Sequence, residues 1–210
     1  MLFIAACFIC CGINLWLSYC LKPKLAGSFK VLASLCLVAL AWTLDLFHNA
    51  PWFIIGLLFC LVGDTLLTMK GKGFTFLIGL VSFLIAHLFY SIAFIHLGTA
   101  IQQLFFVSVI IITLTTLVGR WLLEGLSPTH KRLVSGYLFV ISTMVSLSLS
   151  LPPEIHGRFF LGFGACIFAI SDVFVAINRF KKPNFINRLL GLPLYYLAQI
   201  LLILGFNKML

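Results

Sequence analysis

The chain has 210 residues, of which 62% are hydrophobic and only 9% are charged, with a formal net charge of +9. A soluble domain of this size usually carries about 25% charged residues, so the composition excludes a water-soluble globular protein and indicates a membrane protein. The seven cysteines fall in apolar runs, with no CxxC pair near histidines, which indicates buried thiols and neither disulfides nor zinc ligands.

Eight apolar stretches are long enough to cross a bilayer, which takes about 20 residues. They cover residues 2–21, 30–48, 51–69, 74–97, 101–119, 133–151, 159–178 and 189–206. The first stretch lacks the basic start of a signal peptide, so we expect it to be retained as a span. The predicted fold class is all-α: one polytopic membrane domain of eight transmembrane helices over residues 1–210, with short loops and antiparallel neighbours.

The basic residues are distributed unevenly between the two sets of loops. Only Arg158 and Lys208 belong to the even-numbered side. The odd-numbered loops and their flanks hold Lys22, Lys24, Lys30, Lys70, Lys72, Arg120, Lys131, Arg132, Arg179, Lys181, Lys182 and Arg188. This bias predicts that both termini lie on the non-cytoplasmic side of a membrane, which we expect to be a bacterial inner (plasma) membrane. It suits contact with anionic lipid headgroups, whereas basic residues dispersed over short loops give little support to nucleic-acid binding.

Two aspartates, Asp64 and Asp172, lie inside apolar spans. A carboxylate in hydrocarbon costs about 2.5–3.5 kcal/mol even on the mildest scale, so such residues usually have a role with protons, ions or polar ligands. Each precedes a basic loop by six or seven residues, which places both at a similar depth of about 9–11 Å. Two neighbouring carboxyls in a low dielectric do not ionise equally, so one could remain an acid while the other is charged. The alternative is that each only satisfies a polar contact between helices.

A weak internal echo relates the third and fourth spans to the seventh and eighth. After each aspartate, the next span carries the same spacing of small and polar residues: Gly79, Ala86 and His87 in one copy, Gly191, Ala198 and Gln199 in the other. A 4+4 parallel duplication explains the echo, and it would bring the two aspartates toward each other.

The remaining candidate site residues are polar groups in spans or at their ends. His87 lies deep in its span, with Tyr90 on the same helical face, and a core histidine bonded to a carbonyl is the alternative. Lys30 opens the second span and is either a phosphate-binding cation or an ordinary snorkelling lysine. The other candidates, for which helix–helix hydrogen bonding is the alternative, are Ser171, Tyr195, Tyr196 and Gln199.

These residues lie in stretches that resemble the YhhN-like family, the integral membrane lysoplasmalogenases. The stretches are 61–67 (LVGDTLL), 79–90 (GLVSFLIAHLFY), 164–172 (GACIFAISD) and 195–199 (YYLAQ), together with Phe29-Lys30 at the start of the second span. The resemblance covers the whole chain and implies hydrolysis of the vinyl ether of a lysophospholipid. The expected products are a fatty aldehyde and glycerophosphoethanolamine or glycerophosphocholine, and no cofactor or metal is implied.

Vinyl ethers hydrolyse through protonation at carbon, which yields an oxocarbenium ion that water traps. This chemistry needs a protonated acid and a negative charge facing the cation, and two buried carboxyls supply both in the related glycoside hydrolysis. We therefore predict Asp64 and Asp172 as the catalytic pair, without assigning which is the acid. His87 and Tyr90 would orient water or relay a proton, and Lys30 would hold the phosphate.

Three other functions fit part of the pattern. Buried aspartates and parallel repeats also occur in proton-coupled small-molecule transporters. A metal-dependent membrane lipid hydrolase is a second alternative, although few histidines lie deep in the spans. A purely structural membrane protein is the third, and the clustered polar residues argue against it. The sequence does not determine headgroup preference, chain-length preference or oligomeric state.

Overall fold

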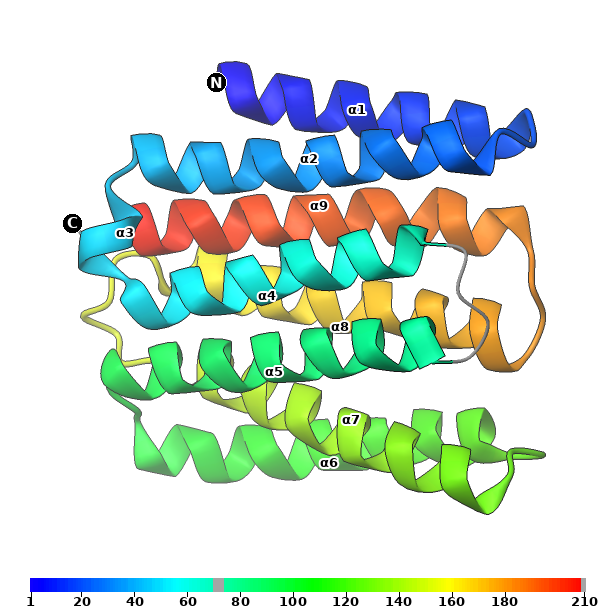
Figure 1. The fold of residues 1–210 in the computed structure, drawn as a ribbon. Coiled ribbons are helices and arrows are strands. Elements are labelled where there is room, and N and C mark those ends of the chain that lie inside the picture. The colour runs from blue at the N-terminus through cyan, green and yellow to red at the C-terminus, as the bar shows by residue number, and fades with distance from the viewer. Residues whose placement is uncertain (70–73, 209–210) are drawn as a thin grey trace. The chain divides into compact units, whose positions relative to one another are not determined.

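A computed structural model of the protein describes residues 1–69 and 74–208 (Figure 1). Within these ranges the secondary structure is helical, without strands, and eight helices are long and apolar enough to cross a membrane. The all-α polytopic fold is thus confirmed, and the protein is an integral, multi-pass membrane protein. The predicted basic loop with Lys70 and Lys72 lies outside the described residues, and the orientation of the termini stays a prediction.

The chain divides into two compact units, Met1–Tyr90 and the part from Ser91 onward. Helix α5 runs across this boundary. The single domain over residues 1–210 stays a prediction.

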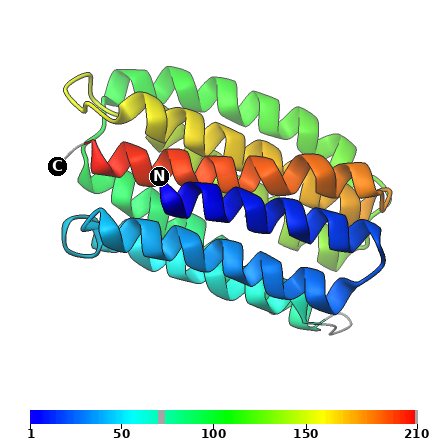
Figure 2. The same ribbon diagram turned by 90° about the horizontal axis from the view of Figure 1, so that it is seen from above.

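The first unit is built from α1, α2, α4 and the greater part of α5. Its helices are α1 (Leu2–Tyr19), α2 (Pro23–Thr43), the short α3 (Leu46–Asn49), α4 (Pro51–Thr68) and α5 (Phe74–His96). Helices α1 and α2 form an antiparallel hairpin, visible in Figures 1 and 2, and α2 also packs against α4. The buried Asn14 side chain of α1 donates a hydrogen bond of 2.5 Å to the carbonyl oxygen of Ala26 in α2. This bond satisfies a polar side chain that would be costly to leave unpaired in an apolar interior.

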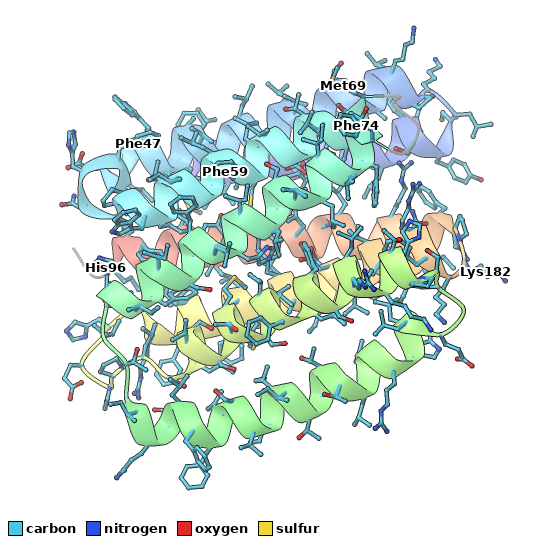
Figure 3. All side chains as sticks on the ribbon, turned by 60° about the horizontal axis from the view of Figure 1, so that its bottom comes forward. Phe47, Phe59, Met69, Phe74, His96 and Lys182 are labelled. Atoms are coloured by element: carbon cyan, nitrogen blue, oxygen red, sulfur yellow. The ribbon has the colours of Figure 1, made fainter. Side chains whose placement is uncertain are left out.

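Helices α4 and α5 approach closely because α4 carries glycine where α5 carries aromatic rings. A methyl group on Gly56 would lie 2.5 Å from the Tyr90 ring, and one on Gly63 would lie 2.7 Å from the Phe83 ring. Ser82 of α5 donates a hydrogen bond of 2.7 Å to the carbonyl oxygen of Phe59. Figure 3 shows Phe59 part-way along α4, with Met69 and Phe74 near the ends of α4 and α5 that precede and follow residues 70–73.

The second unit is a bundle of four long helices together with the last turns of α5. They are α6 (Ile101–Leu123), α7 (Pro128–Leu149), α8 (Arg158–Phe180) and α9 (Phe185–Asn207). Consecutive helices pack side by side, and the α8–α9 contact is the most extensive (Figure 1). Figure 3 shows His96 and Lys182 at opposite ends of this unit. Seven basic residues lie at the Lys182 end: Arg120, Lys131, Arg132, Arg179, Lys181, Lys182 and Arg188.

Three helices begin earlier than the hydropathy of the sequence indicates. Helices α2 and α7 begin at Pro23 and Pro128, where the predicted spans begin at 30 and 133. Proline is favoured in the first turn because the missing N–H has no helical partner there and its φ angle suits the helix. Helix α9 begins at Phe185, four residues before the predicted 189, with the Asn184 side chain accepting the N–H of Ile186. The prediction that Lys30 opens the second span is therefore wrong, because Lys30 lies two turns inside α2.

Candidate functional site

Asp64 of α4 is the centre of a buried polar cluster in the first unit. Its side chain is 1% exposed, and Oδ1 lies 2.8 Å from the Nζ atom of Lys30. The Ser34 hydroxyl donates a hydrogen bond of 2.5 Å to Oδ2. Both carboxyl oxygens are thus held by α2, since residues 30 and 34 follow each other by one helical turn.

A close approach of α2 and α4 makes this cluster possible. A methyl group on Gly27 of α2 would lie 2.9 Å from Cβ of Thr68, one turn beyond Asp64 in α4. The Lys30 side chain, 18% exposed, reaches inward from the edge of the unit to the buried carboxyl. A buried ion pair adds little net stability, because desolvation offsets the attraction, but removing one partner is strongly destabilising.

His87 of α5 is almost fully buried, with 1% of its surface exposed. Its Nδ1 atom lies 2.5 Å from the carbonyl oxygen of Phe83. A carbonyl oxygen only accepts, so Nδ1 carries the hydrogen, and in the neutral ring Nε2 is then the acceptor. The hydrogen bond thus fixes the tautomer and leaves Nε2 as a hydrogen-bond acceptor.

Tyr90 lies one turn from His87 in the same helix and is fully buried. Its hydroxyl is 3.6 Å from the sulfur of Cys60, and its ring stacks on Phe53 with the centroids 5.1 Å apart. The His87 and Tyr90 rings meet edge to face at 6.5 Å. These contacts hold the phenol in one orientation, as a site residue requires.

Asp172 of α8 belongs to the second unit and is half-buried. The hydroxyl of Tyr137, on α7, donates a hydrogen bond of 2.7 Å to its Oδ2 atom. A carboxyl that receives a hydrogen bond from a neighbouring helix is held in a fixed orientation, which is one requirement of a catalytic group.

The remaining predicted residues of this unit form a second polar group on α8 and α9. Gln199 is fully buried, and its Nε2 atom lies 3.5 Å from the Tyr195 hydroxyl, which is the upper limit of a hydrogen bond. Tyr195 and Tyr196 have ring centroids 5.0 Å apart, and both are buried. The buried Ser171 hydroxyl has no hydrogen-bond partner among the residues that the structure describes.

The YhhN family model matches residues 25–206 of the chain. The chain belongs to the YhhN family. The match begins inside α2 and takes in every predicted site residue, whereas α1 precedes it.

Curated relatives extend over nearly the whole chain. Human lysoplasmalogenase TMEM86A is 29% identical over 210 residues, covering 93% of this chain and 84% of its own. Rat lysoplasmalogenase TMEM86B is 30% identical over 212 residues, covering 97% of this chain and 81% of its own. The cattle TMEM86A protein is 25% identical over 210 residues, with 93% and 84% covered. No solved structure matches the chain.

For this YhhN chain, the structure joins Lys30 to Asp64 and adds two residues that sequence reasoning missed, Ser34 and Tyr137. Ser34 lies one turn after Lys30, so the spacing on α2 was an available signal. Tyr137 carried no such signal, because the apolar sequence around it does not show which helix its hydroxyl faces.

The possible metal-binding side chains in the described part of this YhhN chain are its histidines, cysteines and acidic residues. No group of three histidine, cysteine or acidic side chains there is arranged to hold a metal ion. All seven cysteines are free thiols.

Proposed function

We propose that this protein is a lysoplasmalogenase, a membrane hydrolase that cleaves the vinyl-ether bond of lysoplasmalogens. The products would be a fatty aldehyde and glycerophosphoethanolamine or glycerophosphocholine. The observation that carries the proposal is the similarity to curated lysoplasmalogenases over 93–97% of this chain. The hydrogen-bonded carboxyls of the buried Asp64 and the half-buried Asp172 support it, because the reaction depends on acid–base chemistry.

The proposed reaction begins with transfer of a proton from a carboxyl to the vinyl carbon that is not bonded to the ether oxygen. The new C–H bond uses the π electrons, and the positive charge is shared between the adjacent carbon and the ether oxygen. Water adds to that carbon and gives a proton to the second carboxylate, which yields a hemiacetal. The hemiacetal then releases the glycerol oxygen as an alcohol and becomes the aldehyde. We propose that Asp64 and Asp172 supply the proton and the opposing negative charge.

Lys30 is proposed to bind the phosphate of the substrate. An ammonium group has three N–H donors, so contact with Asp64 leaves capacity for a phosphate oxygen. The partial exposure of Lys30, beside a buried Asp64, fits a cation that meets a charged headgroup at the edge of the unit. The proposal assigns no residue to the part of the headgroup beyond the phosphate, so it is compatible with both ethanolamine and choline.

His87 is proposed to orient the attacking water through Nε2. Its Nδ1 hydrogen is committed to the Phe83 carbonyl, which keeps the ring in the tautomer that accepts at Nε2. Tyr90 would hold the ring in place from the next turn. A fixed acceptor for water contributes more to the reaction rate than a mobile one, because the reacting atoms have to meet in a narrow range of geometries.

Ser171, Tyr195, Tyr196 and Gln199 are proposed to line the substrate path in the second unit. Their polar atoms suit the glycerol hydroxyls, and the surrounding apolar side chains suit the alkenyl chain. We propose a bacterial inner membrane as the location, with membrane lipids as the surroundings, and no nucleic acid or cofactor as a partner.

The test is hydrolysis by the purified full-length protein in detergent or in vesicles. Lysoplasmenylethanolamine is the substrate, and the alkyl-ether and acyl lysophospholipids of the same chain length are matched controls. We expect aldehyde from the vinyl ether alone, and unchanged activity after treatment with a strong chelator. No aldehyde at all would overturn the proposal, and loss of activity with the chelator would favour a metal-dependent hydrolase.

A further inference from the structure

The hydroxyl of Ser34 lies within hydrogen-bond distance of two acceptors. Its Oγ atom is 2.5 Å from Oδ2 of Asp64 and 3.2 Å from the backbone carbonyl oxygen of Lys30. The residue is 3% exposed, so water does not easily replace either partner. This single hydroxyl therefore connects the buried carboxyl with the backbone of the helix that carries the lysine.

A hydroxyl has one hydrogen to donate and two lone pairs that accept. While Asp64 is ionised, the Ser34 hydrogen points to Oδ2, in a bond that the negative charge strengthens. If Oδ2 takes up a proton, Ser34 can accept that hydrogen and turn its own toward the Lys30 carbonyl. The carboxyl then has a hydrogen-bond partner in both protonation states, whereas an unpaired polar group in this interior would be costly.

The other carboxyl oxygen has a different partner. Oδ1 lies 2.8 Å from the Lys30 ammonium, so an opposite charge is in direct contact with it before substrate binds. A substrate phosphate that shares Lys30 weakens this contact, and the bond from Ser34 then keeps the carboxyl in the same plane. The two contacts thus have different roles. The Lys30 contact changes with the charge of the ligand, and the Ser34 hydrogen bond fixes the orientation of the Asp64 carboxyl.

We propose that Ser34 is a positioning residue that holds Asp64 as it changes protonation state during the hydrolysis proposed above, on which this assignment rests. Asp64 starts ionised and takes a proton from the water that attacks the oxocarbenium carbon. The O–H bond of water breaks as the C–O bond forms. Asp64 returns this proton to the glycerol oxygen when the hemiacetal C–O bond breaks, and the Ser34 hydrogen turns once in each direction. The first proton, to the vinyl carbon, then comes from Asp172, the other member of the proposed pair, which regains a proton from the hemiacetal hydroxyl as the aldehyde C=O bond forms.

The kinetic test compares Ser34→Ala with Ser82→Ala. Both serines are buried and donate to a neighbouring helix, but Ser82 bonds a backbone carbonyl and not a carboxylate. We expect Ser34→Ala to lower kcat by about 10- to 100-fold with KM changed less than about twofold, as for a lost bond to a charged group. Ser82→Ala should keep kcat within about threefold. An equal loss in both variants, or a raised KM with unchanged kcat, would overturn the assignment.

A second readout does not depend on turnover. Aspartate labelled with 13C at the side-chain carboxyl gives an infrared carboxylate band for Asp64, identified by its loss in Asp64→Asn. We expect this band to shift in Ser34→Ala and to stay in place in Ser82→Ala. An unmoved band in Ser34→Ala overturns the role of Ser34, whereas absence of aldehyde from the wild-type protein overturns the proposed function.

Discussion

Helices α4 and α5 of the first unit pack in the same manner as α8 and α9 of the second. The glycine eight residues before each aspartate lies against an alanine of the following helix. A methyl group on Gly56 would lie 3.0 Å from the Ala86 carbonyl oxygen, and one on Gly164 would lie 3.1 Å from that of Ala198. The two contacts occupy corresponding positions in the internal echo of the sequence.

A second pair of glycines, on α5 and α9, makes corresponding contacts with α4 and α8. A methyl group on Gly79 would lie 3.5 Å from the carbonyl oxygen of Gly63, the residue before Asp64. One on Gly191 would lie 3.5 Å from the carbonyl oxygen of Ser171, the residue before Asp172. These matching contacts, each measured within one unit, support the predicted duplication.

The two hairpins differ in what surrounds their carboxyls. Asp64 is fully buried and meets a lysine and a serine of α2, whereas Asp172 is half-buried and meets a tyrosine of α7. Both α2 and α7 are the second span of their half, so the supporting helix is equivalent and only its side chains have changed. The comparison teaches that one scaffold holds two carboxyls in different surroundings, as an acid–base pair with separate roles needs.

The largest expected effect is the loss of turnover in Asp64→Asn. Asparagine keeps the shape but carries no charge and accepts no proton, so we expect vinyl-ether hydrolysis to fall by about 10³-fold or more. Asp172→Asn should lose about 10²-fold or more, since it removes the other member of the pair. Aldehyde release measures both, and Asp45→Asn, at an exposed position, is the control. Near-full activity in both variants would refute the carboxyl mechanism.

Lys30→Gln should lower stability more than any neutralised lysine at the surface. Breaking a buried ion pair by removing one partner costs about 3–5 kcal/mol, and the partial exposure of Lys30 points to the lower end. Thermal unfolding in detergent measures the loss. Lys24→Gln, on the same helix but exposed, should change stability by about 0.5 kcal/mol or less. Equal unfolding temperatures for the two variants would mean that the ion pair contributes nothing.

Alanine at the first glycine of each hairpin tests how closely the two packings correspond. Gly56→Ala should cost about 2–3 kcal/mol, because its methyl group would meet the Tyr90 ring, which is held by stacking on Phe53. Gly164→Ala should cost less, about 1 kcal/mol, since its shortest contact, with the Leu202 side chain, is longer, at 3.0 Å. Unfolding temperatures in detergent rank the two. The reverse order would contradict this account of the interface.

Tyr137→Phe is the smallest change and isolates one hydroxyl group. It leaves the ring and removes the donor to Asp172, so we expect about a tenfold fall in kcat with little change in unfolding temperature. Tyr19→Phe, at an exposed position at the end of α1, serves as the control for loss of a phenol. An unchanged kcat in Tyr137→Phe would show that Asp172 does not depend on this bond.

The apolar runs predicted the spans well, because backbone N–H and C=O groups inside lipid must be hydrogen-bonded within the protein. Eight long apolar stretches therefore have few possible structures other than helices. Helix starts were harder, since hydropathy counts Lys22 to Lys30 as a loop although Pro23 already begins α2. Because α2 begins at Pro23, Lys30 lies two turns inside the helix, where its side chain contacts Asp64. The spacing of Ser34, one turn after Lys30, was a signal in the sequence, but it did not identify the acceptor, because a serine in a helix usually bonds its own backbone. Only the packing of α2 on α4 turns its hydroxyl to a carboxyl.

The Asn14–Ala26 hydrogen bond has a consequence for the lysine. In an α-helix, the carbonyl of residue 26 is also the acceptor for the N–H of residue 30. Asn14 therefore bonds to the helical turn that precedes Lys30. Helix α1, which lies ahead of the family match, therefore stabilises the turn of α2 that carries Lys30. A relative with a different first helix would need another hydrogen bond or contact to stabilise the corresponding turn of the second helix.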